Sequence, residues 1–196
     1  MTKRTKQIIK FLEEIEKFKL VERQTYLSNL KTRESDAEHA WHMTMIVWLL
    51  STIIKKKFDV IHTIKLALVH DLPEIYAGDT YRFDVKGNMT KRAREAKAAR
   101  KLFSQLPKDL SSEFHNLWNE YESNKTYEAK LVHFVDGISP GIQNMLSKGK
   151  AWRKLKLDKG SALKRRDELL GYIENNELKN WLIDLVDSAI ELKYLR

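Results

Sequence analysis

Apolar residues recur at helical spacing along almost the whole chain. Near the N-terminus, three- to four-residue intervals separate Ile8, Phe11, Leu12, Ile15 and Phe18. Such intervals place apolar side chains on one face of a helix. A polar stretch over residues 28–33 interrupts the pattern. Further helices are predicted over residues 36–56, 60–71, 90–105, 107–122, 126–141 or just beyond, 161–174 and 177–194. The pattern therefore predicts an all-α protein, a bundle of about seven or eight helices.

Several predicted helix ends carry a recognisable signal. Ser35 stands three residues before Glu38, which is the spacing of a capping box, and an apolar run follows. Asp59 is expected to cap the next helix, and Pro73 to end it near Asp71, because the proline ring crowds the preceding turn. The starts of three later helices are assigned to Thr90, Pro107 and Thr126.

Composition narrows the class of protein. The 196 residues have the length of one domain, and only seven glycines and three prolines argue against a many-stranded β protein. The absence of cysteine excludes disulfide scaffolds, iron–sulfur clusters, cysteine zinc fingers and thiol nucleophiles, and it fits the reducing cytoplasm. The longest apolar stretch, residues 43–54, is too short to cross a membrane. We expect no signal peptide.

The net charge of +9 comes largely from two basic clusters. Residues 91–101 hold six basic side chains and one acid, and residues 148–166 hold nine basic side chains and one acid. A solvated face is the favoured interpretation. The alternatives are an electrostatic funnel for nucleotides and a nucleic-acid surface. Nucleic acid is not expected as a partner, because no motif typical of nucleic-acid binding accompanies the charge.

The chain has six histidines, so a transition-metal site would combine imidazole with carboxylate ligands. His39 lies in the first turn of an apolar helix, His70 and Asp71 lie at the end of another, and Asp136 lies late in a third. Helix bundles commonly build metal sites from side chains on facing helices. Glu74 brings a further carboxylate to the same corner. Burying these groups together without a cation would be costly.

Two segments carry a family resemblance, LALVHDLPEIYAGDT (residues 66–80) and ESDAEHAWHM (residues 34–43). They resemble the HD-domain metal-dependent phosphohydrolases. The similarity to the branch of 5′-deoxynucleotidases continues through residues 91–140. The resemblance covers roughly residues 18–145 and implies a single HD domain over residues 1–196. Helices in residues 146–196 would pack on this core or form a dimer interface.

The resemblance implies an enzyme that hydrolyses the phosphomonoester of nucleoside or deoxynucleoside 5′-monophosphates with a metal-activated water. It also implies a homodimer with a small phosphorylated substrate, and the lack of cysteine fits a cytoplasmic location. Two alternatives stay open. One is an HD hydrolase acting on another phosphorylated metabolite or a nucleotide polyphosphate. The other is a non-catalytic HD protein that binds nucleotides or nucleic acid.

Site residues follow from the same resemblance. It implies one divalent ion (Mn, Co, Fe, Ni, Zn or Mg) held by His39, His70, Asp71 and Asp136. Glu74 would act with Asp71 in catalysis by positioning or deprotonating the water. The expected substrate-binding residues are Arg23 for the phosphate, Asp79 for the sugar hydroxyl, and their neighbours Gln24 and Thr80.

Two positions depart from the family pattern. Gln24 stands where the deoxynucleotidases have a tryptophan that excludes ribose, which leaves discrimination against ribonucleotides open. Gly137 follows Asp136 where the family usually has lysine or arginine.

The sequence makes less specific predictions for the other histidines and for the tryptophans. His42 is expected to pack beneath the site or to bond a group that supports it, with metal binding as the alternative. His133, three residues before Asp136, would complete a second metal centre, but one metal is favoured over a dinuclear centre. Four tryptophans are expected in the core: Trp41, Trp48, Trp118 and Trp181. Trp152 is expected in the core or an interface, with base stacking as the alternative.

Overall fold

The computed structural model describes residues 1–195, and almost all of its regular structure is helical. Its helices are α1 (Lys3–Ile15), the 3-10 helix η1 (Glu16–Leu20), α2 (Asp36–Leu50), α3 (Val60–Val69), α4 (Glu74–Ala77), α5 (Val85–Phe103), α6 (Lys108–Ser123), α7 (Tyr127–Leu146), α8 (Lys150–Lys154), α9 (Lys159–Leu170) and α10 (Asn176–Glu191). Two short strands, β1 (Glu22–Tyr26) and β2 (Arg33–Ser35), form an antiparallel hairpin. The predicted all-α class is confirmed. Within residues 1–195, no helix is both long and apolar enough to span a membrane.

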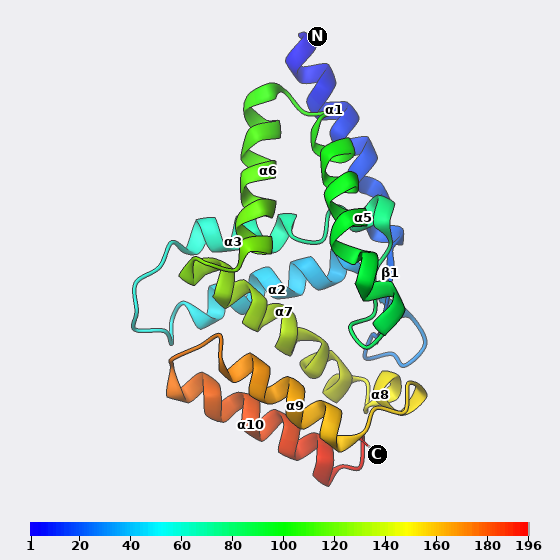
Figure 1. Cartoon of the computed structure of the whole chain (residues 1–196), viewed down its shortest axis with the longest axis vertical. Helices are drawn as coiled ribbons and strands as arrows, with labels where there is room; N and C mark the ends of the chain where they lie inside the picture. Colours follow the sequence, from blue (N-terminus) through cyan, green and yellow to red (C-terminus); the bar gives the residue numbers. More distant parts are fainter. Residues whose placement is uncertain (196) are drawn as a thin grey trace.

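Three helices form the centre of the molecule. α2, α3 and α7 pack against one another, with α5 and α6 on one side and the α9–α10 pair on the other (Figure 1). The core where they meet contains Met43, Leu66, Phe103, Val132 and Phe134, none of which is exposed. Burial of these large side chains fixes how the three central helices lie, and so determines where their polar residues converge.

Four of the predicted helix signals agree with the structure. One is Thr126, which caps α7 by accepting a hydrogen bond from the backbone N–H of Ala129 at 3.1 Å. Ser35 and Glu38 form the complete capping box at the start of α2. The Asp59 side chain accepts a hydrogen bond from the backbone N–H of His62 at 2.9 Å and so caps α3. α3 ends at Val69, four residues before Pro73, as the proline predicts.

Other boundaries were wrong. The segment 36–56 stops being helical after Leu50. α5 begins at Val85 rather than Thr90, because Asp84 caps it by accepting from the backbone N–H of Gly87 at 3.0 Å. The basic stretch after α7 contains the short helix α8. Finally, α7 continues past Gly137 and Pro140 to Leu146, since neighbouring helices hold it in place.

The tryptophans only partly follow the prediction. Trp118 is buried, but Trp41, Trp48 and Trp181 are 64%, 59% and 37% exposed, so their assignment to the core was wrong. α2 is apolar on nearly all sides, and its periodicity therefore does not reveal which face is covered. Trp152 packs half-buried against a small second cluster of Leu157, Ala189 and Leu195.

Candidate metal centre and active-site cavity

Four side chains meet where α2, α3 and α7 converge. Each offers one ligand atom, and the four atoms lie within 4.8 Å of one another: His39, His70, Asp71 and Asp136. The two histidines are buried. These are the residues that the sequence predicted as metal ligands, and the fold brings all of them together.

Local structure explains how each helix delivers its ligand. The capping box fixes the first turn of α2, where His39 lies one residue after Glu38. His70 is the C-terminal cap of α3, and the chain then turns towards Pro73. Because the helix stops there, the adjacent His70 and Asp71 side chains bend towards the same point, with 3.0 Å between His70 Nε2 and Asp71 Oδ2.

The cluster fits a divalent cation. His70 Nδ1 donates a hydrogen bond to the carbonyl oxygen of Ala67 at 2.8 Å. This fixes the tautomer in which the lone pair of Nε2 faces the cluster. This buried Nε2 makes no hydrogen bond among the described residues. Asp136 Oδ1 lies 3.2 Å from His39 Nε2 and 4.0 Å from His70 Nε2. Ligands about 2.0–2.2 Å from one ion would have such separations.

Metal binding needs neutral imidazole and ionised carboxylate, and the pKa shifts favour these states at His39 and Asp136. At His70, burial lowers the pKa, but the charge and hydrogen bond of Asp71 outweigh burial and raise it, so a divalent ion would displace a proton there. Burial and the Arg23 charge lower the pKa of His39 to about 4. Burial opposes ionisation of Asp136, but a hydrogen bond from His39 and the nearby histidine charges hold its pKa well below the usual range. Tyr121 donates a hydrogen bond to the other Asp136 oxygen at 3.2 Å and orients the carboxylate.

A second group of acids adjoins the first. Asp36, Asp71 and Glu74 are buried and offer oxygens within 4.8 Å of one another. Arg23 Nη1 lies 3.0 Å from an oxygen of Asp36 and 3.0 Å from an oxygen of Asp71, so its charge partly neutralises both. Burial and the Asp71 charge raise the pKa of Asp36 to about 7, although Arg23 opposes the shift.

Glu74 is the member of this group without a guanidinium partner. Its nearest cation is Lys91, whose Nζ lies 3.5 Å from Oε1. Its other oxygen, Oε2, is buried and makes no hydrogen bond among the described residues. Burial and the carboxylates of Asp71 and Asp36 raise the pKa of Glu74 well above its usual range. This carboxylate therefore has a high proton affinity and a free oxygen at the site.

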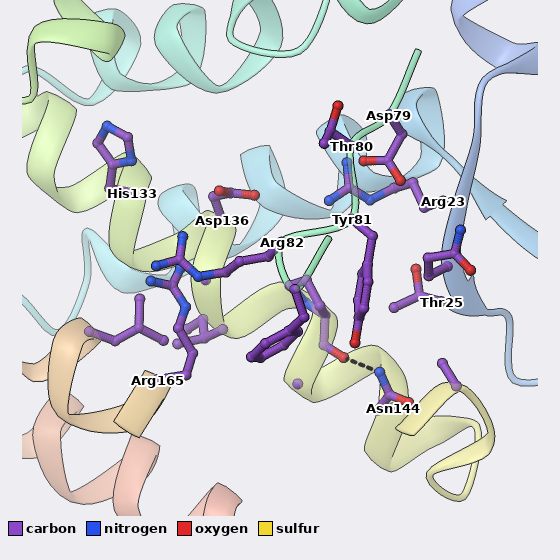
Figure 2. Close-up of a pocket in the computed structure, with 18 of the residues that line it drawn as sticks. Arg23, Thr25, Asp79, Thr80, Tyr81, Arg82, His133, Asp136, Asn144 and Arg165 are labelled. Carbon is purple, nitrogen blue, oxygen red and sulfur yellow. Dashed lines mark hydrogen bonds between the residues drawn. The ribbon is translucent and has the colours of Figure 1, made fainter. Parts of the chain in front are cut away.

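A cavity of about 460 Å³ opens beside the two groups, a size suited to a small-molecule ligand. All four predicted substrate-binding residues line it: Arg23, Gln24, Asp79 and Thr80. Gln24 accepts a hydrogen bond from Arg33 at 3.1 Å, and the Thr80 hydroxyl accepts one from Arg94 at 2.8 Å. In Figure 2, Asp79 and Thr80 lie close to Arg23 on one side of Asp136.

The other histidines have different surroundings. His133 lines the cavity, but its Nε2 lies 2.9 Å from the Tyr121 carbonyl, and its ring stacks on the Tyr121 ring. His42 stacks against the exposed Trp41, and His62 pairs with Glu120 at 2.8 Å. Among the described residues, the ligand groups contain no histidine besides His39 and His70.

Three residues of the site were missed in the sequence. Asp36 reads as an ordinary acidic residue of a first helical turn, and Lys91 as one charge in a basic run. Tyr121 lies on an amphipathic helix and reads as core. Only the fold, which joins distant segments, reveals that all three border the metal centre.

Comparisons with known proteins agree with this geometry. A family model described as HD domain matches residues 15–175. The chain is 34% identical to 5′-deoxynucleotidase HDDC2 of Danio rerio over 69% of its length and 67% of the relative's. For the human protein of that name the identity is 30%, over 67% of this chain and 63% of the relative. The chain thus spans about two thirds of the length of these curated relatives.

Solved structures with a similar fold include one whose sequence identity is comparable to that of these relatives. A crystal structure of a predicted metal-dependent phosphohydrolase from Magnetospirillum magnetotacticum is 34% identical. It superposes with a TM-score of 0.88, covering 98% of this chain and 95% of that one. A conserved hypothetical protein from Pyrococcus furiosus has the same fold, with a TM-score of 0.65 at 24% identity.

Proposed function

This chain belongs to the HD domain family, and we propose that it is a metal-dependent phosphohydrolase that hydrolyses nucleoside or deoxynucleoside 5′-monophosphates. The observation that carries the proposal is the four-ligand group of His39, His70, Asp71 and Asp136 beside a cavity of nucleotide size. The two relatives named 5′-deoxynucleotidase support the substrate class.

The two histidines and two aspartates would hold one divalent ion. Such an ion supplies Lewis acidity, which lowers the pKa of water and offsets the negative charge of a phosphoryl group. The ligand set suits several ions, including Mn, Co, Fe, Ni, Zn and Mg, so the identity of the metal is left to experiment. Asp71 has a second task, because its carboxylate also accepts a hydrogen bond from Arg23 and so orients that guanidinium.

Glu74 would be the general base. Its free Oε2 would accept a proton from the water that attacks phosphorus. The P–O bond to the nucleoside 5′-oxygen then breaks, and the proton held by Glu74 passes to that oxygen, giving nucleoside and inorganic phosphate. Because Glu74 is buried beside Lys91, its position is restrained and its protonated form has little access to solvent.

Arg23 would bind the phosphate, because it lines the cavity and only its Nη1 donates to Asp36 and Asp71, at 3.0 Å, while its Nε lies 4.0 Å from Glu34. Asp79, beside Arg23, would accept a hydrogen bond from a sugar hydroxyl. Gln24 and Thr80 would border the sugar. Gln24 is smaller than tryptophan, so we expect ribose to be accepted along with deoxyribose.

To test this proposal, the release of phosphate from different nucleotides is measured in the presence of each metal ion. We expect phosphate release from ribo- and deoxyribonucleoside 5′-monophosphates in the presence of one or more of the six ions, and none from 3′-monophosphates or after EDTA treatment. Turnover confined to another phosphorylated metabolite would contradict the substrate. Salt-sensitive binding of a polynucleotide without any turnover would contradict the enzyme itself.

We also propose that the whole chain is a single domain that works in the cytoplasm as a homodimer. α9 and α10 pack on α7, which supports one domain and leaves their apolar face covered by the chain itself. The lack of cysteine is compatible with a reducing compartment. A different surface supports the dimer: Trp41, Trp48 and Leu49 of α2 are all more than half exposed, and a second copy would cover them.

The dimer is tested by mass in solution. Light scattering after size exclusion is expected to give twice the chain mass for the wild type and the monomer mass for Trp48→Lys. The control is Leu20→Lys, because Leu20 is also exposed but lies outside α2. A monomeric wild type at tens of micromolar, or an unaltered dimer in Trp48→Lys, would contradict the proposed interface.

A further inference from the structure

Two arginines in the cavity share a single carboxylate. Arg82, in the segment between α4 and α5, donates to Glu168 Oε2 at 2.7 Å, and Arg165 of α9 donates to the same oxygen at 3.3 Å. Both arginines line the cavity beside the metal centre. One acid therefore serves two guanidinium groups. The Arg82 side chain is 55% exposed and partly hydrated, whereas that of Arg165 is 17% exposed.

Gly137 allows Arg165 to approach the metal centre. A Cβ at position 137 would lie 2.7 Å from Arg165 Nη2 and 2.2 Å from Leu169 Cδ2. Any larger residue would therefore push Arg165 and Leu169 away from α7. The glycine after Asp136 leaves room for a cation from another helix, where the family usually has a basic side chain.

The surroundings of Arg165 leave its charge exposed to the cavity rather than to bulk water. Its side chain is only 17% exposed. Burial and the charge of Arg82 lower the pKa of Arg165, although Asp136 and Glu168 oppose this shift. An anion bound between the two arginines would relieve their repulsion and restore the charge balance.

These arginines are separate from Arg23. Figure 2 shows Arg82 and Arg165 on one side of Asp136 and Arg23, with Asp79, on the other. Arg23 is held by Asp36 and Asp71 at the metal centre itself. The cavity thus offers cations on both sides of the proposed reaction centre, and a substrate with one phosphate engages only one of them.

We propose that Arg82 and Arg165 form a second anion subsite, which binds a phosphate group other than the one that is hydrolysed. The site then takes nucleotides that carry two phosphate groups, either a 5′-diphosphate or a 3′,5′-bisphosphate. Guanidinium forks are suited to such groups because they donate two parallel hydrogen bonds to phosphate oxygens. The inference rests on the proposed function for the identity of the first phosphate.

Binding measurements test the subsite without turnover. In a metal-loaded Glu74→Gln background, isothermal titration gives the dissociation constants of a 5′-monophosphate, its 5′-diphosphate and its 3′,5′-bisphosphate. We expect the second phosphate to tighten binding by about tenfold or more in one of the two compounds. That compound identifies the source of the second phosphate. Equal affinity of all three compounds overturns the proposal.

Substitutions assign the effect to the two arginines. Arg82→Gln and Arg165→Gln are each expected to lower the ratio of monophosphate to two-phosphate dissociation constants by about tenfold. The matched control is Arg100→Gln, an exposed arginine of α5 outside the cavity, which should keep the ratio. An unaltered ratio in both cavity variants overturns the proposal.

Substitution of Glu168 distinguishes an anion subsite from a set of ion pairs that is only structural. If Glu168 competes with a bound phosphate, Glu168→Gln frees both arginines and raises the ratio by about threefold. If the three residues only brace the segment after α4 against α9, Glu168→Gln lowers affinity for all three nucleotides alike, which overturns the proposal. Hydrolysis of the 5′-monophosphate by the wild type reports separately on the proposed function, so the two failures are distinguishable.

Discussion

Glu74→Gln is expected to lower kcat for 5′-monophosphate hydrolysis by about 10²- to 10⁴-fold, the usual contribution of a general base. Glutamine keeps the shape of the side chain but cannot take a proton from water. KM should change little, because Arg23 and the metal ligands remain in place. Metal content, measured by mass spectrometry of the purified variant, is expected to equal that of the wild type, since Glu74 lies outside the four-ligand group.

Glu95→Gln is the matched control for that loss. Glu95 is also buried and also lies beside Lys91, with 3.4 Å between Lys91 Nζ and Glu95 Oε1, but it belongs to neither acid group. Glu95 also lines the cavity, but it offers no oxygen to either ligand group, so we expect its kcat to stay within about threefold of the wild type. Equal losses in both variants would mean that charge near Lys91 matters, and that Glu74 is not the base.

Three residues of the candidate metal centre could be predicted because they lie in short motifs. His39 stands next to a capping box, and His70 and Asp71 directly precede a proline that ends their helix, so sequence alone indicates both their type and their backbone setting. Asp136 is different, since nothing local marks a helical aspartate. It was found through the family resemblance, and its role depends on α7 crossing α2 and α3.

The roles of those basic-cluster residues that line the cavity could not be predicted from the sequence. Arg165 reads as one charge among nine in the basic segment 148–166, and it is the packing of α9 on α7 that brings it beside Gly137. Lys91 likewise belongs to the other basic cluster and reaches Glu74. A solvated face, the favoured interpretation of both clusters, is therefore incomplete, because four of their cations line the cavity: Lys91, Arg92, Arg165 and Arg166.

The hairpin and the exposed tryptophans reveal a second limit. β1 has five mostly polar residues and shows no alternation long enough to predict a strand, yet its pairing with β2 carries Arg23 to the metal centre. For α2, apolar residues surround the helix, and tertiary packing alone decides that Met43 is buried while Trp48 is exposed. Periodicity predicts that an element exists, but not which neighbour covers it.

Asp71→Ala is expected to abolish both metal retention and phosphatase activity. The wild type, after EDTA treatment and dialysis, should gain about 2.7 kcal/mol of stability when metal is added at 100 times its dissociation constant, seen as a rise in Tm. The substitution removes one of four ligands and also a partner of Arg23, so neither the ion nor the guanidinium keeps its position. The Tm of the variant should therefore not rise when metal is added.

The gain in Tm on metal addition is a better measure than the Tm itself. Without metal, Asp71→Ala loses its contact with Arg23 but also relieves repulsion with Asp36 and Glu74, and these effects on stability oppose each other. Asp109→Ala serves as the control, because Asp109 is an exposed acid whose ion-pair partner within residues 1–195 is Arg4, at 2.7 Å, and it should leave the metal-dependent gain intact. A stoichiometric metal content in Asp71→Ala, or hydrolysis at the wild-type rate, would refute the assignment of Asp71 as a ligand. The gain in Tm and the phosphatase activity have to be measured together, since a chain that binds the ion elsewhere would keep the gain in Tm while losing activity.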